Sequence, residues 1–291
     1  MKLRTLLFLV LILLTQLASA AISLVDDEGQ TIVLASPARR IISLSPHVTE
    51  LLFAAGGGQY IVGAISYSDF PEAAKKIPVI GDNRALDIER ILALKPDLVI
   101  VWRDLISAKQ IVQLRHLGIP MFFTAANKLQ DIPASLQSFG KLMATETQAN
   151  LAAQELRAQI NALTSRYAHR TPVRLFYQVW DKPLYTLNGQ HIVSDAIRTC
   201  GGVNIFANLN IIAPNVSIEA VLEQDPQAII ATAEKNPSDG GVTMWTRYPS
   251  MTAVRQHNLF LVDGNLLNRP GPRMITGVAE LCAKLDGART H

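Results

Sequence analysis

Residues 87–100, DIERILALKPDLVI, recur in outline 130 positions later as residues 217–230, SIEAVLEQDPQAII. In each copy a side chain that can cap a helix, Asp87 or Ser217, precedes apolar residues at positions i, i+3 and i+4. A proline then ends the helix before an apolar strand. Because the offset is constant, the repeat predicts two lobes of similar build, each with a short helix that leads into a buried strand.

The repeat also places two carboxylates at equivalent positions. Glu89 and Glu219 are each the second residue of the expected helix, roughly 100° around the helix from the apolar stripe, so both side chains should reach solvent. A glutamate there also interacts favourably with the helix N-terminus, by roughly 0.3 to 1 kcal/mol. That interaction explains a single glutamate better than a matched pair. Two matched surface charges suggest a partner that is itself two-fold.

The N-terminal residues have the three-part pattern of a secretory signal peptide. Lys2 and Arg4 precede an apolar stretch at 6–14, and Ala-Ser-Ala at 18–20 follows as a cleavage site. We therefore expect residues 1–20 to be removed and the product to be a soluble exported protein. A membrane span needs about 20 apolar residues, and no later stretch reaches that length without charges. No cysteine follows the apolar stretch, so no lipid anchor is expected.

Charge and cysteine content narrow the function classes. Without Lys2 and Arg4 the formal net charge falls from +3 to +1, and no dense basic run with interleaved aromatics remains, so a nucleic-acid partner is not expected. The chain has two cysteines, Cys200 and Cys282. An even count in an exported chain favours a disulfide. The alternative is a pair of inert buried thiols.

From Arg40 onward apolar strand-like runs alternate with helical periods, which is typical of βα units around a parallel sheet. Expected strands lie at 41–44, 61–65, 98–102, 120–123, 173–179 and 184–187, and expected helices at 46–55, 106–117, 192–199 and 271–285. The segment between the lobes differs, because its apolar residues follow helical spacings with no glycine or proline: Leu156, Ile160, Leu163 and Tyr167. The prediction is an α/β protein with a first lobe at 21–144, one long connecting helix at 145–170 and a second lobe at 171–291.

Motifs for catalysis are missing from the sequence. There is no Gly-x-Ser-x-Gly elbow, no Walker loop and no His-Glu-x-x-His, and the glycines at 56–58 follow a helix and so read as a helix stop. The six histidines lack the i, i+4 spacing of a helical metal pair. We therefore assign no catalytic residue and no metal site, and we favour a binding protein over an enzyme.

Aromatic and polar residues at strand ends are the better signal for a ligand site. Tyr67 follows one expected strand, Trp102 and Arg103 end another, and Trp180 and Tyr185 lie around a turn after a third. Rings at these positions can face a large flat ligand in a cleft between two lobes. Each ring taken alone is more often core or turn packing, but several at the mouths of strands favour ligand contact.

His47 follows Ser45-Pro46 at a helix start. One interpretation is a histidine near a helix cap. The other is an imidazole that faces the cleft and can donate a hydrogen bond or coordinate a metal centre.

Several segments together resemble the class III substrate-binding proteins of ABC importers, and within that family the members that bind cobalamin. The segments are ISLSPHVTEL at 42–51, SYSDFP at 66–71, IERI at 88–91 with LKPDLV at 94–99, and CGGVNIF at 200–206. The resemblance covers almost all of the chain after residue 20. The chain departs from the cobalamin-binding pattern at Asn83, at Leu266-Leu267 and at His47.

The resemblance implies a fold and a set of roles. The fold would be two Rossmann-like lobes with parallel sheets joined by a single long helix, with limited closure on ligand. Tyr67 and Trp102 would line the cleft from the first lobe, and Tyr185 and Arg269 from the second. Glu89 and Glu219 would dock onto arginines of the membrane subunits, and Cys200 would pair with Cys282.

The expected function is therefore that of a periplasmic receptor, monomeric when free. It would capture cobalamin or a related corrinoid as a transported ligand, with no cofactor of its own, and deliver it to an inner-membrane permease dimer with its ATPase subunits. A second hypothesis keeps the fold but makes the ligand haem or an iron chelate, with His47 or Tyr67 as an axial ligand. A third, an exported enzyme that uses the cleft, has no nucleophile with a neighbouring base to support it.

Overall fold

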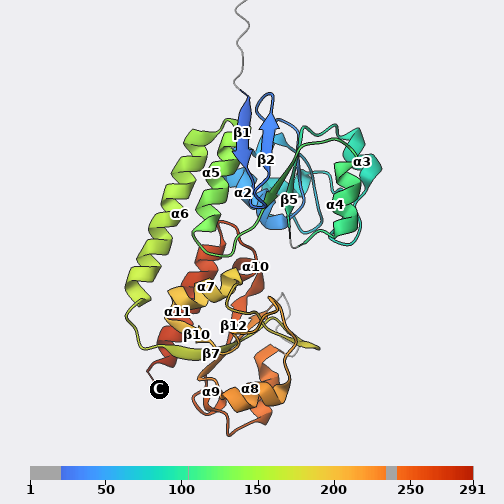
Figure 1. Ribbon diagram of the computed structural model, residues 1–291. Coiled ribbons are helices and arrows are strands. Elements are labelled where there is room, and N and C mark those ends of the chain that lie inside the picture. The colour runs from blue at the N-terminus through green and yellow to red at the C-terminus, as the bar shows by residue number, and fades with distance from the viewer. Residues whose placement is uncertain (1–20, 104, 234–240, 291) are drawn as a thin grey trace, which may run out of the picture.

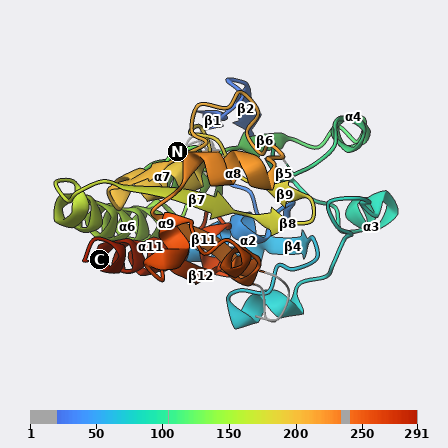
Figure 2. The ribbon, with the colours of Figure 1, turned by 90° about the horizontal axis from the view of Figure 1, so that it is seen from below.

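The structure is a computed structural model, and it describes residues 21–103, 105–233 and 241–290. The expected signal peptide at 1–20 lies outside the described residues. Figure 1 shows two lobes stacked one above the other, with one long helix, α6 (Glu146–Tyr167), running along one side of both. Figure 2 shows the same arrangement from below, with α6 and α11 (Met274–Ala288) on one side and α3 (Ile88–Ala93) on the other.

The first lobe is built on a four-stranded sheet in which all neighbouring strands are parallel, in the order β4-β3-β5-β6. Its strands are β3 (Ile41–Ser43), β4 (Ile61–Ala64), β5 (Leu98–Trp102) and β6 (Met121–Thr124). Its helices are α2 (Pro46–Ala54), α3, α4 (Ala108–Arg115) and α5 (Asp131–Met143), with 3-10 turns η1 (Gly58–Tyr60) and η2 (Glu72–Lys76).

The second lobe has a sheet of the same design, parallel throughout, in the order β10-β7-β11-β12. Its strands are β7 (Val173–Gln178), β10 (Gly202–Asn204), β11 (Ala228–Ala233) and β12 (Leu259–Asp263). Its helices are α7 (Ile192–Thr199), α8 (Ile218–Gln224), α9 (Thr252–Arg255), α10 (Gly264–Leu267) and α11, with the 3-10 helix η3 (Gly241–Arg247).

The two sheets explain the sequence repeat. In the first sheet β3 lies between β4 and β5, and in the second sheet β7 lies between β10 and β11. In both sheets the third strand in chain order, β5 or β11, is the strand that belongs to the sequence repeat. The helix before it begins with the expected cap, because Asp87 accepts a hydrogen bond from the backbone N–H of Arg90 and Ser217 accepts one from Ala220. The predicted α/β class with two lobes and parallel sheets is confirmed.

Helix α6 packs against α2 and α5 of the first lobe and against α7 and α11 of the second. It buries a stripe of residues at spacings of four, three and four, namely Ala149, Ala153, Leu156 and Ile160. Helix α5, which precedes it, was not predicted. Its proline lies in the first turn, where the missing N–H is tolerated, and it ends at Ala144 in a left-handed conformation with φ 52° that separates α5 from α6.

Two antiparallel hairpins also went unpredicted. β1 (Ile22–Val25) pairs with β2 (Thr31–Leu34) and packs on α5. In the second lobe the strand expected at 184–187 is shorter: β9 (Leu184–Tyr185) pairs with β8 (Trp180–Asp181), and Tyr185 forms a further bridge with Asn215. Among the described residues, no helix combines the length and the apolar character that a membrane crossing requires.

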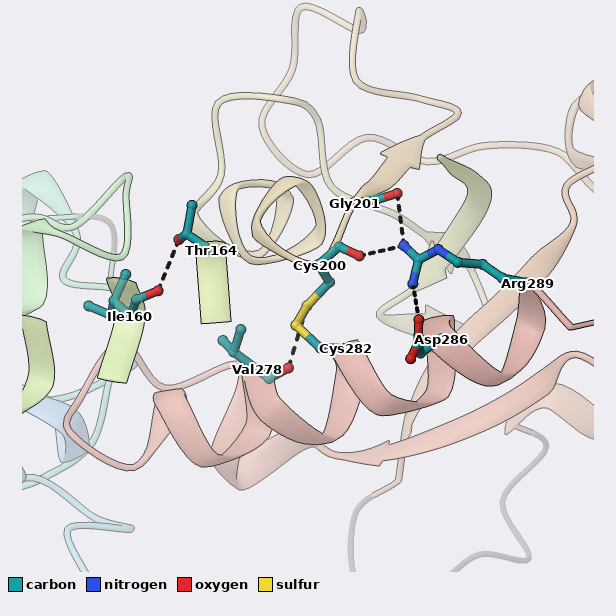
Figure 3. Close-up of a disulfide and its surroundings, with 8 residues drawn as sticks. All are labelled: Ile160, Thr164, Cys200, Gly201, Val278, Cys282, Asp286 and Arg289. Atoms are coloured by element: carbon teal, nitrogen blue, oxygen red, sulfur yellow. Dashed lines mark hydrogen bonds and ion pairs between the residues drawn. A yellow bond between two sulfur atoms is a disulfide. The ribbon is translucent and has the colours of Figure 1, made fainter. Parts of the chain in front are cut away.

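The expected disulfide is present and lies inside the second lobe. Cys200 at the end of α7 is bonded to Cys282 in α11, 82 positions away in sequence. Figure 3 shows Arg289 beside this bond: its guanidinium donates to the carbonyl of Cys200 at 2.7 Å and to Asp286 at 3.1 Å. The disulfide joins the C-terminal end of α7 to the middle of α11, and the arginine joins it to the C-terminal end of α11.

Reduction of this disulfide should lower the stability of the second lobe. In the chain-entropy model, closing a loop of this length lowers the entropy of the unfolded chain and so raises its free energy by about 4 kcal/mol. We expect a loss of that size in the free energy of unfolding when dithiothreitol is added, measured by urea denaturation. A Cys200→Ala, Cys282→Ala variant should show the lower stability with or without reductant. A midpoint unchanged by reduction would contradict the expected contribution.

Candidate functional site

The site begins where the carboxyl ends of β3 and β5 lie side by side. β3 pairs with β5 in parallel, with Ser43 opposite Ile100, so the residues that follow each strand meet at one edge of the sheet. Ser45 and Pro46 start α2 immediately after β3, and this start carries His47 to Trp102, the last residue of β5. The two rings meet edge to face, with centroids 4.3 Å apart and planes at 88°.

His47 is a buried, neutral imidazole. Its side chain Nδ1 lies 2.6 Å from the hydroxyl oxygen of Ser45, and the residue is only 5% exposed. Burial, together with the positive charge of Arg269, lowers the pKa of His47 to about 3. The ring is therefore uncharged at neutral pH, and it supports the indole of Trp102.

Four charged side chains connect the lobes beside this pair of rings, and we call them the inter-lobe charge cluster: Glu50, Asp69, Arg269 and Arg273. The strongest contact is bidentate. Arg273 donates from Nε to Glu50 Oε2 at 2.9 Å and from Nη2 to Oε1 at 2.6 Å. The Glu50 side chain is 2% exposed. The hydrogen bonds to this carboxylate raise the pKa of Arg273 further above its usual value.

Arg269 makes the second connection between the lobes. Its Nη1 donates to Asp69 Oδ1 at 3.0 Å and to the carbonyl oxygen of Tyr67 at 3.5 Å, and it lies 3.9 Å from Glu50 Oε1. Burial acts to raise the pKa of Asp69, but the hydrogen bond and charge of Arg269 outweigh it and hold that pKa below its usual value. The carboxylate therefore stays ionised.

The chain between the two arginines runs close to α2. A Cβ added at Gly271 would lie 3.4 Å from Glu50 Oε2 and 3.5 Å from the Cβ of His47, so this turn of the second lobe rests on the helix that carries the site in the first. The guanidinium of Arg273 also packs on the Phe70 ring, with its central carbon 4.0 Å from the ring centroid. At this point the contact between the two lobes is thus held by ion pairs and an aromatic ring.

Tyr67 stands at the edge of this cluster with its ring in solvent. The residue is 77% exposed and has a left-handed backbone with φ 66°. Its carbonyl is the oxygen that Arg269 contacts. The arginine of the second lobe therefore fixes the turn from which the ring of the first lobe projects.

The remaining predicted residues lie on other elements of the two lobes. Trp180 and Tyr185 face each other across the β8–β9 hairpin of the second lobe, where the exposed indole of Trp180 donates to the carbonyl of Lys182 at 3.1 Å. Tyr185 is half-buried and forms a bridge with Asn215. Glu89 and Glu219 are exposed near the starts of α3 and α8.

Arg103 lies at a different feature, a cavity of about 280 Å³ within the first lobe. The cavity is lined mainly by polar side chains, including Asp27, Thr124 and Asp131. A large flat ligand needs apolar and aromatic walls, so the rings at the junction of the lobes fit such a ligand better than this cavity does.

Sequence reasoning missed Arg273, and it quoted Glu50, Asp69 and Phe70 within motifs without assigning them a role. One signal was available, because Glu50 is a carboxylate within the apolar run of α2. Across residues 21–103, 105–233 and 241–290, no group of three or more His, Cys, Asp or Glu side chains could hold a metal ion.

Comparison with known proteins decides the family. The model of the family described as "Periplasmic binding protein" matches residues 41–266. The chain belongs to this family.

Relatives within the periplasmic binding protein family include proteins of known ligand. The chain is 36% identical over 254 residues to a vitamin B12-binding protein of Vibrio cholerae, which covers 87% of this chain and 91% of that protein. A crystal structure of a periplasmic vitamin B12-binding protein of the same species matches with a TM-score of 0.82 at 34% identity, over 88% of this chain and 99% of the other.

A haem-binding member of the family is also similar. The apo form of a periplasmic haem-binding protein from Roseiflexus sp. RS-1 matches with a TM-score of 0.74 at 27% identity, over 86% of this chain and 99% of that one. Both solved structures share the two-lobed architecture of this periplasmic binding protein.

The burial of His47 predicts a dependence of stability on pH. The imidazole has a pKa of 6.5 when unperturbed and about 3 in the folded chain, so between these values the unfolded state binds the extra proton and stability falls as the pH falls. We expect the protein to lose about 2 kcal/mol more than a His47→Gln variant between pH 6.5 and pH 4.5, measured from urea unfolding curves. Parallel curves for the two proteins would show that His47 is not held neutral.

Proposed function

We propose that this protein is the periplasmic receptor of an ABC importer and that it captures cobalamin or a related corrinoid. The observation that carries the proposal is the similarity to the vitamin B12-binding protein of Vibrio cholerae along 88% of the chain, with a TM-score of 0.82. The aromatic residues at the lobe junction support it. A macrocycle with two flat faces gains most from rings that project from both lobes.

In this proposal each lobe supplies one part of the ligand site. Tyr67 offers an exposed ring and Trp102 a half-buried one, which His47 braces from the side. Tyr185 and Trp180 offer rings from the hairpin of the second lobe. Arg269 contacts the turn that carries Tyr67, so it would lie at the boundary between ligand and lobes.

The receptor would act without chemistry of its own. The Ser45 hydroxyl lies beside His47, but both residues are buried and the lowered pKa of the imidazole makes it a weak base. The family is one of binding proteins. We expect the exported chain to work as a monomer in the periplasm, with cobalamin as a transported ligand rather than a cofactor.

The second candidate ligand is haem or an iron chelate. The haem-binding relative from Roseiflexus sp. RS-1 favours it, as does the exposed phenol of Tyr67, which has the chemistry of an axial iron ligand. His47 is a weaker candidate for that role, because its ring is buried and its Nδ1 contacts Ser45.

Titration with cyanocobalamin and with ferric haem would separate the two candidates. We expect calorimetry to show tighter binding of cyanocobalamin, and Tyr67→Ala to weaken it by about tenfold because a stacking ring is lost. Tyr67→Phe is the matched control, because it keeps the ring and removes the hydroxyl. Tight haem binding with a Soret shift that Tyr67→Phe abolishes would instead support the haem alternative.

We further propose that Glu89 and Glu219 dock the receptor onto the two membrane subunits of a permease that works with ATPase subunits. Both carboxylates are exposed, both occupy the second position of a capped helix, and the two helices belong to corresponding parts of the two lobes. A pair of equivalent charges suits a partner with two equivalent subunits. Rim charges of this kind act on association and register.

Replacing both carboxylates should uncouple delivery from capture. We expect a Glu89→Ala, Glu219→Ala variant to bind cyanocobalamin with the affinity of the unchanged protein and to lose stimulation of the permease ATPase in reconstituted vesicles. Glu223→Ala is the control, because this exposed glutamate lies on α8 but has an alanine, Ala93, at the corresponding position of the first lobe. Full stimulation by the double variant would contradict the docking role.

A further inference from the structure

We propose that Asp69 is a specificity residue, which keeps Arg269 neutralised and so favours a corrinoid without net charge over a tetrapyrrole that carries free carboxylates. The inference rests on the proposed function, because it concerns the ligand chemistry of the same site. It starts from the balance of charges where the lobes meet.

The inter-lobe charge cluster contains as many carboxylates as guanidinium groups. Glu50 and Asp69 come from the first lobe, and Arg269 and Arg273 from the second. His47, which lies beside them, is uncharged. The cluster therefore adds no net charge to the region where a ligand would contact Tyr67 and Trp102.

The two arginines differ in how firmly they are held. Arg273 makes two short hydrogen bonds to a carboxylate that is 2% exposed, and its guanidinium packs on the Phe70 ring. A ligand could release it only by leaving the Glu50 charge buried without a partner, which is strongly unfavourable. Arg273 is thus a structural connection between the lobes.

Arg269 is held more weakly, by a carboxylate that lies nearer to solvent. Its guanidinium makes one hydrogen bond at 3.0 Å to Asp69, whose side chain is 49% exposed, and its other neighbours lie at 3.5 and 3.9 Å. It also contacts the turn of Tyr67, a ring expected to face the ligand. Arg269 is therefore the cation that a ligand carboxylate could approach, and Asp69 is the group that such a carboxylate would have to replace.

The chemistry of the two ligand classes makes this competition selective. Haem carries two propionate carboxylates, whereas cyanocobalamin carries no net charge and presents amides around its corrin ring. A propionate near Arg269 would meet the ionised carboxylate of Asp69, and like charges at short range are repelled. An amide meets no such repulsion. Specificity then comes from an anion that the protein itself supplies.

The test is Asp69→Asn, which keeps the shape of the side chain and removes its charge. Three probes would be titrated: cyanocobalamin, ferric haem and haem dimethyl ester, which lacks free carboxylates. We expect the ratio of haem affinity to cyanocobalamin affinity to rise by about tenfold or more, because Arg269 gains a charge-assisted hydrogen bond to a propionate. The ester should show no such gain.

Two further variants keep the result specific. Glu72→Gln changes the net charge by the same amount three residues away, but Glu72 is 83% exposed and pairs with Lys75. The ratio of haem affinity to cyanocobalamin affinity in this variant should therefore equal that of the unchanged protein. Adding Arg269→Met to Asp69→Asn should return the ratio to that value. Because Asp69 is half-exposed, Asp69→Ser offers a second neutral variant if the asparagine folds poorly by circular dichroism.

An unchanged ratio in Asp69→Asn, an equal rise in Glu72→Gln, or an equal gain for the diester would each overturn the inference. These outcomes differ from failure of the proposed function, which would show as no binding of cyanocobalamin by the unchanged protein.

Discussion

One continuous hydrophobic core runs through both lobes along α6, and the relative position of the two lobes depends on it. The core includes Leu136 and Phe139 of α5, the buried stripe of α6, and Leu281 and Leu285 of α11. A large separation of the lobes would expose this apolar surface to water, at about 25 cal/mol for each Å². The architecture therefore favours a site whose two walls are already near their working positions.

The inter-lobe charge cluster adds a polar constraint to this apolar one. Glu50 is buried and pairs with charged arginines. Removal of Arg273 would leave the Glu50 carboxylate buried without its main partner, which would lower the free energy of unfolding by about 3 to 5 kcal/mol. The same turn of the second lobe holds Arg269 against the Tyr67 carbonyl. Core packing thus sets the distance between the lobes, and the ion pairs set which loops face each other.

The sequence predicted the features that local signals specify. Caps, apolar periods and prolines predicted the repeat helices and the strands β3, β5, β7 and β11, since each signal lies within a few residues. Helix α5 was not predicted, because it contains a proline and a glycine, which made the helical periodicity of its apolar residues harder to recognise. Glu50 and Arg273 are separated by 223 positions, so no local pattern could pair them. The roles of the ring residues remain predictions, because they depend on contacts with a ligand.

The lobes share a topology but have diverged where they meet. The equivalent surfaces keep a matched glutamate on α3 and α8, while the junction takes its anions from the first lobe and its cations from the second. If both lobes had the junction loops of the first lobe, carboxylates would face carboxylates, and their repulsion would oppose contact between the lobes. Charge complementarity therefore requires unlike junction loops on like scaffolds. In the proposed function, that division would let the outer surface stay two-fold for a symmetric permease while the inner surface is shaped for an asymmetric ligand.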